Sequence, residues 1–153
     1  MPLTACDSIL NQMLDSRART FGLSIAAWLI VGIFWYFATR SAHPTQHLAV
    51  VTTSALIITY AAAAYINHLL LLPRFWRQGR TPAYLGTLLT MMFALTAIAL
   101  TVIRTTYLRA LGPDPDPNGL AKHFAIDFIG MAVHLIGAEI AVRLYHRIAA
   151  HRA

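Results

Sequence analysis

The sequence predicts an all-α fold, a four-transmembrane-helix bundle with both termini in the cytoplasm. Of the 153 residues, 58% are apolar and only 12% are charged, whereas a soluble domain is about half apolar and a quarter charged. Four apolar stretches are each long enough to cross a bilayer core of about 30 Å as a helix. The chain has one cysteine, Cys6, so no disulfide can form within it.

The four apolar stretches define the predicted domain organisation. Residues 1–20 precede them and are expected to form an N-terminal interfacial segment, because apolar residues recur there at helical spacing. The spans are placed at about 21–39, 48–72, 83–103 and 124–143, within one membrane domain of residues 21–148 that is followed by a tail of residues 149–153.

The basic residues predict the orientation of the spans. Cytoplasmic loops carry an excess of Lys and Arg, and here these residues divide eight to four between the two sides. The richer side has Arg17, Arg19, Arg74, Arg77, Arg80, Arg143, Arg147 and Arg152, and the poorer side has Arg40, Arg104, Arg109 and Lys122. Both termini are therefore predicted to be cytoplasmic. The net charge of +6 is interpreted as a mark of topology, and binding to nucleic acid is not expected.

The fourth span carries most of the ionisable residues that the sequence places in the membrane. Such groups are costly in lipid, so each is a functional candidate. Asp127 lies one turn below the predicted outer surface, where Arg104 ends the third span. We expect these two to form an ion pair that locks the fold, with a ligand clamp as the alternative. Glu139 and Arg143 are four residues apart, which suits an ion pair within the helix.

Histidines form a second group of candidates. His134 lies near mid-span and is expected to be a neutral packing residue bonded to Thr90 or Thr96, with a metal, haem or proton role as the alternative. The predicted outer face gathers His43, His47 and His123. Imidazole and carboxylate groups suit zinc, copper or iron, but these residues form no tight metal motif. We interpret them as interfacial histidines, expect no cofactor, and leave metal binding open.

The end of the second span combines a proline with polar and aromatic residues. Pro73 is expected to stop or bend the helix, because it has no backbone N–H and its ring crowds the preceding turn. Arg74 and Trp76 are expected to anchor the span at headgroup level. Asn67 and His68 lie deeper and are predicted to hydrogen-bond a neighbouring helix or to bind a ligand.

This segment resembles part of a known family. Asn67, the run Leu72-Pro73-Arg74-Phe75, a basic stretch and Tyr84 resemble the junction between the second and third spans of LytS-type sensor histidine kinases. In that family four hydrophobic helices precede a coiled coil and a kinase domain. This sequence has no phosphate-binding glycine motif, so the resemblance implies the membrane sensor region without the kinase domain.

We therefore expect a non-enzymatic sensor-like or regulatory module, multi-pass in the bacterial inner membrane, that transmits a signal to a cytoplasmic signalling protein. Its other expected partners are the lipid bilayer and further copies of the chain, in a dimer or larger homo-oligomer. The alternatives are an oligomeric channel or membrane-disrupting effector, and a haem- or metal-binding redox protein that uses His47 with His123. The signal-sensing candidates are Asp127, His134, Arg104, His47, His123, Asn67 and His68, and the candidates for partner contact at the inner surface are Arg74, Arg77, Arg80 and Arg143.

Overall fold

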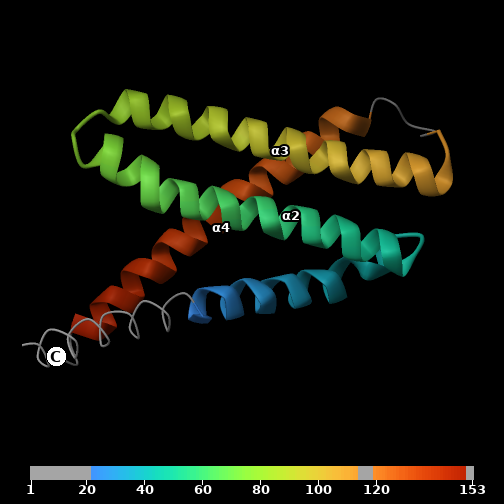
Figure 1. Cartoon of the computed structure of the whole chain (residues 1–153), viewed down its shortest axis with the longest axis horizontal. Helices are drawn as coiled ribbons and strands as arrows, with labels where there is room; N and C mark the ends of the chain where they lie inside the picture. The colour runs from blue at the N-terminus through green and yellow to red at the C-terminus, as the bar shows by residue number, and fades with distance from the viewer. Residues whose placement is uncertain (1–21, 114–118, 151–153) are drawn as a thin grey trace, which may run out of the picture.

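The protein is a bundle of four long helices, as the sequence predicts (Figure 1). The computed structural model describes residues 22–113 and 119–150, and over these residues the chain forms helices and short turns without a β-strand. The predicted interfacial segment 1–20 lies outside the described residues.

The second, third and fourth helices are longer than the predicted spans. The first helix covers residues 22–39 and continues into a 3₁₀ turn, η1 (Arg40–Ala42). The remaining elements are α2 (Gln46–Ile66), the π-helix η2 (Asn67–Trp76), α3 (Thr81–Leu111) and α4 (Gly119–Ala150). The four stretches that are long and apolar enough to cross a membrane are Gly22–Ala42, Gln46–Trp76, Thr81–Leu111 and Leu120–Tyr145.

The third span extends well past its predicted end. Arg104 does not terminate α3, because a charged side chain leaves the backbone hydrogen bonding of a helix intact. The helix ends at Leu111, where Gly112 follows at a φ of 86°, a conformation that glycine adopts without strain. Arg104 therefore lies within the helix, about 10 Å along the axis from Leu111 at 1.5 Å per residue.

Pro73 does not end the second span either. It lies inside η2, whose wider turns bond residues five positions apart: the Arg77 N–H donates to the Leu72 carbonyl at 3.1 Å. An α-helix would place the proline ring against the carbonyl four residues back, and the π-helical turn avoids that arrangement. The chain leaves η2 at Trp76 and turns at Gly79, which has a φ of 72°, to begin α3.

The core lies where α4 crosses the antiparallel pair of α2 and α3 (Figure 1). Its buried members are Tyr60, Ala63, Met92, Met131 and Leu135. The first helix runs alongside α2, and none of its described residues is buried. Large apolar side chains are exposed on the outer faces of all four helices, which is the pattern expected for contact with lipid.

Candidate functional site

A cavity of about 710 Å³ lies at the end of the bundle that carries the His43–Thr45 turn and Gly112. We call it the Asp127 cavity, and we call this end the predicted outer end. Small-molecule sites commonly have volumes of about 300–1,000 Å³. The polar part of the lining comes from α2, α3, α4 and the turn after η1, and consists of His43, Thr52, Arg104, Tyr107, His123 and Asp127. The cavity is thus large enough for a small ligand or a lipid headgroup.

Asp127 and Arg104 line this cavity from different helices, and both are half-buried. Over residues 22–113 and 119–150 no ion pair joins them, so the predicted lock is wrong. The open cavity supplies the physical reason, because each charge can be hydrated there without meeting the other. The backbone of Asp127 is tied to another helix, since its carbonyl accepts a hydrogen bond from the Tyr60 hydroxyl at 3.3 Å.

His43 and Tyr107 form a second polar contact in the lining. A hydrogen bond joins Nδ1 of His43 to the Tyr107 hydroxyl, and the two rings meet edge to face with centroids 6.2 Å apart. Burial lowers the pKa of His43 below its ordinary value of 6.5. The contact holds the turn between the first helix and α2 against α3. The sequence analysis did not identify Tyr107, because nothing in the spacing of these residues relates them.

The Asp127 cavity is adjacent to a smaller one of about 260 Å³, which we call the side lobe. The side lobe runs between the first helix and α2, and Trp35, Ile57 and Tyr60 contribute to its lining. The residues common to both linings are Ala42, His43, Thr52 and Leu56. The Thr52 hydroxyl is buried and has no hydrogen-bond partner in the described part of the chain. Buried hydroxyl groups are normally bonded, so the Thr52 hydroxyl is an unsatisfied polar group beside the two cavities.

The predicted cluster of outer histidines is only partly brought together. His43 and His123 line the Asp127 cavity, whereas His47 is exposed and is not part of that lining. The haem pair of His47 and His123 that the redox alternative requires is therefore not gathered in one cavity. The described residues contain no group of three or more His, Cys, Asp or Glu side chains arranged to hold a metal ion.

His134 is a packing residue, as expected, but its partner is not the predicted one. Its Nδ1 donates to the Gly130 carbonyl at 2.8 Å, and its Nε2 accepts from the indole N–H of Trp35 at 3.0 Å. Its ring also packs on Tyr60, with centroids 4.7 Å apart. Both ring nitrogens are therefore used, which defines a neutral ring with its proton on Nδ1. Neither predicted threonine bonds His134 in the described structure, because the Thr90 hydroxyl donates to the Gly86 carbonyl within α3 and the buried Thr96 hydroxyl has no partner.

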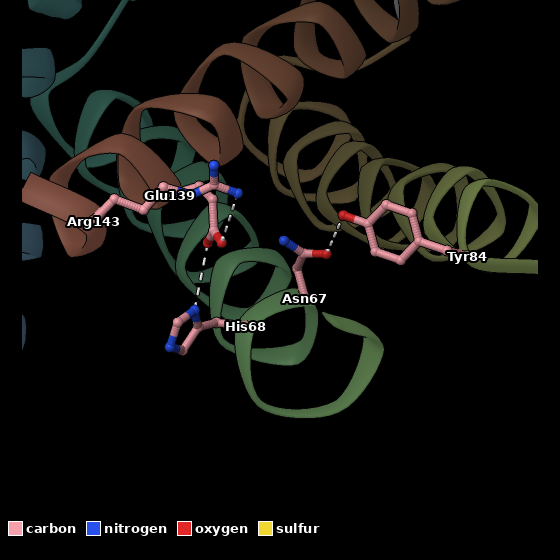
Figure 2. Close-up of polar contacts among 5 residues, drawn as sticks. All are labelled: Asn67, His68, Tyr84, Glu139 and Arg143. Atoms are coloured by element: carbon pink, nitrogen blue, oxygen red, sulfur yellow. Dashed lines mark hydrogen bonds and ion pairs between the residues drawn. The ribbon is translucent and has the colours of Figure 1, made fainter. Parts of the chain in front are cut away.

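Asn67 and His68 lie at the opposite end of the bundle, near the turn between η2 and α3, which we call the predicted inner end (Figure 2). The Tyr84 hydroxyl donates to Oδ1 of Asn67 at 2.9 Å, and Asn67 is only 2% exposed. His68 contacts Glu139 at 3.4 Å, and Glu139 also pairs with Arg143 at 3.8 Å. The predicted contacts of Asn67 and His68 with neighbouring helices and the predicted Glu139–Arg143 pair are thus confirmed.

The Asn67–Tyr84 bond joins two residues of the motif that carries the family resemblance. The sequence analysis named both residues but did not predict their contact, although their place in a single motif was a signal for it. The four arginines proposed to contact a partner are all exposed, and they are Arg74, Arg77, Arg80 and Arg143. Comparison with known proteins matches the chain to no family model, no curated protein and no solved structure.

Proposed function

We propose that this chain is a membrane sensor-like or regulatory module that binds a ligand in the Asp127 cavity and passes the signal to a cytoplasmic partner. The observation that supports this most directly is that one uninterrupted helix, α4, carries both Asp127 and Glu139. These residues are twelve positions apart, which corresponds to about 18 Å along the helix axis. A ligand that displaces one end of α4 therefore displaces the Glu139 end as well.

The contact between Glu139 and His68 connects α4 to η2 at the predicted inner end (Figure 2). η2 is a π-helical segment, and such segments are frequent at functional sites. Beyond it lie the exposed arginines of the turn, Arg77 and Arg80. In the predicted orientation these face the cytoplasm. A ligand that favours one of two arrangements of α4 against η2 would change the surface offered to a partner.

The direction of the polar side chains favours a ligand site over a pore lining. Asp127 and Arg104 line a cavity within a single chain, and both are half-buried. A pore between chains would require these residues on an outward face, and the exposed neighbours Ile126 and Ile129 are apolar. The proposal therefore keeps the sensor-like role and does not extend to the channel.

Electron paramagnetic resonance distances across the predicted inner end test this proposal. Spin labels would be attached to cysteines at the exposed positions Leu70 and Leu144, in a chain whose Cys6 is replaced by serine. Asp127→Asn is expected to shift the distance distribution between the labels, because it changes the charge balance in the cavity. Lys122→Gln is the matched control, since Lys122 is exposed on the same helix outside the lining.

Coupling between two sites is reciprocal, so Glu139→Gln should in turn change the distance between labels at Leu111 and Leu120 on the rim of the cavity. Arg104→Gln provides a second cavity variant in case Asp127→Asn does not fold. If neither cavity variant changed the inner distance and Glu139→Gln left the rim unchanged, α4 would transmit nothing and the proposal would be wrong.

A further inference from the structure

We propose that the ligand of the Asp127 cavity is an aminophospholipid of the surrounding membrane, with its phosphate at Arg104 and its primary ammonium group at Asp127. Any effect of this lipid on signalling rests on the proposed function, but binding of the lipid can be tested separately. Four features support it: two opposite charges that do not pair with each other, the chemistry of each, the apolar remainder of the lining, and the exposed rim.

The two charges select a headgroup with both signs. Arg104 and Asp127 line one cavity and form no ion pair with each other over the described residues. An anionic ligand would meet the like charge of the carboxylate, and a cationic ligand would meet the like charge of the guanidinium. Uncompensated charge is costly where solvent is excluded, so a headgroup with one charge of each sign fits the cavity better than either.

The chemistry of the Arg104 and Asp127 side chains indicates which charged groups the ligand carries. A guanidinium group presents a planar set of N–H donors that matches two phosphate oxygens. A carboxylate accepts hydrogen bonds, so it distinguishes a primary ammonium group with its N–H donors from a quaternary one that has none. Quaternary ammonium groups are typically bound by several aromatic rings, and among the described residues Tyr107 is the one Phe, Tyr or Trp that lines this cavity.

The remainder of the lining suits an acyl chain. Leu56, Leu100 and Ile103 form apolar walls around the polar groups. The side lobe begins at the shared residue Leu56 and continues past Ile57 and Trp35 between the first helix and α2. A molecule that fills both spaces must therefore be an amphiphile with a polar head and an apolar tail.

The rim indicates that this amphiphile comes from the bilayer. Leu108, Leu111 and Leu120 line the cavity and are also exposed, at 39%, 54% and 42%. They belong to helices that are apolar and long enough to cross a membrane. A lipid can therefore enter sideways between exposed leucines, whereas a water-soluble zwitterion would gain nothing from this apolar rim.

Trp35 provides a reporter for the acyl chain, because it lines the side lobe. Trp28→Phe and Trp76→Phe leave Trp35 as the single tryptophan of the chain. This variant would be placed in phosphatidylcholine nanodiscs with increasing mole fractions of phosphatidylethanolamine or phosphatidylglycerol carrying brominated chains, which quench nearby indole fluorescence. Brominated phosphatidylethanolamine is expected to reach half-maximal quenching at a mole fraction at least threefold lower than brominated phosphatidylglycerol or phosphatidylcholine.

Charge variants assign the two ends of the headgroup. Arg104→Gln should raise the half-quenching mole fraction about tenfold for both phosphatidylethanolamine and phosphatidylglycerol, because a charged hydrogen bond to the phosphate is lost. Asp127→Asn should abolish the preference for phosphatidylethanolamine over phosphatidylglycerol. Arg109→Gln should change neither value, because Arg109 is exposed on the same helix and does not line the cavity.

Several results would overturn the inference. Equal quenching by the three brominated lipids would show that the site does not distinguish their headgroups, and a preference for phosphatidylglycerol would show that it is a simple anion site. Glycerophosphoethanolamine, the headgroup without acyl chains, should not relieve the quenching; full relief would identify a soluble ligand and exclude the lipid.

The same samples separate this inference from the proposed function. If phosphatidylethanolamine binds selectively but leaves the distance between labels at Leu70 and Leu144 unchanged, the lipid site stands and the sensor role fails. If Asp127→Asn shifts that distance while no lipid quenches Trp35 selectively, transmission stands and the lipid assignment fails.

Discussion

Gly130 on α4 allows a close approach of Tyr60 from α2, and replacing it tests how the bundle is held together. A Cβ atom at position 130 would lie 2.7 Å from the Tyr60 hydroxyl oxygen, so the ring, only 6% exposed, would have to move. Overpacking of this kind costs about 1–3 kcal/mol. The displaced hydroxyl would also lose its bond to the Asp127 carbonyl, worth about 1 kcal/mol. The higher helix propensity of alanine stabilises the variant by about 1 kcal/mol and offsets part of this loss. Gly130→Ala should therefore lower the free energy of unfolding by about 1–3 kcal/mol.

The structure also specifies how this loss can be reversed. The Tyr60 ring carbon that bears the hydroxyl lies 3.5 Å from the same Cβ position, which is an ordinary contact distance. Tyr60→Phe should therefore destabilise the wild-type protein by removing a hydrogen bond, yet stabilise the Gly130→Ala variant by removing the clash. The two substitutions should be coupled, with an interaction energy within the range of about 0.5–3 kcal/mol seen for residues in contact.

Equilibrium unfolding in mixed detergent micelles, followed by far-UV circular dichroism, measures these differences. Gly137→Ala is the control on the same helix, because a Cβ atom there meets nothing within 4 Å, and it should be neutral or stabilising. If Tyr60→Phe lowered the free energy of unfolding equally with Gly and with Ala at position 130, the close approach would not be the cause of the loss.

Three further predictions concern polar contacts. Tyr84→Phe should lower the free energy of unfolding by about 1–3 kcal/mol in the same titration, because the buried Asn67 amide loses its donor; an unchanged midpoint would contradict that bond. Nitrogen NMR of the imidazole should show the proton of His134 on Nδ1, and a proton on Nε2 would contradict the bond from Trp35. Burial lowers the pKa of His43, so the unfolded chain binds more protons, and stability should fall as the pH drops through 6.5 towards that lowered value. His43→Gln should remove this part of the pH dependence, and an identical pH profile would refute it.

The four spans could be predicted because hydropathy over about 20 residues depends on composition alone. Their ends could not be predicted in this way. Arg104 interrupts the apolar run of the third span, but backbone geometry at Gly112 ends the helix. Pro73 normally breaks an α-helix, and here a π-helical turn accommodates it. In both places the end of the helix depends on backbone conformation, which a hydropathy pattern does not describe.

The candidate site could be predicted as a set of residues but not as a set of contacts. Asp127, Arg104 and His123 were all assigned to one side of the membrane, and they line one cavity. The partner of His134 could not be predicted, because it depends on how the helices are rotated about their axes. In a soluble helix a single apolar face sets that rotation, but these helices also expose large apolar side chains on their outer faces, so an apolar face does not identify the side that packs inward. Nothing in the sequence therefore indicated the contact of His134 with Trp35, which is 99 residues away.

The absence of an ion pair between Asp127 and Arg104 in the described structure bears directly on what the cavity is for. If these charges served stability alone, pairing would be the expected arrangement, and apolar residues of similar volume would often be at least as stable as the pair. Each ionised group in a span costs about 2.5–3.5 kcal/mol at the helix centre, and the cavity of about 710 Å³ reduces that cost by leaving room for water around both. A ligand entering this cavity meets both charges already separated, so it displaces water and breaks no internal pair. Two opposite charges held apart in one cavity are thus arranged for a headgroup that carries both signs.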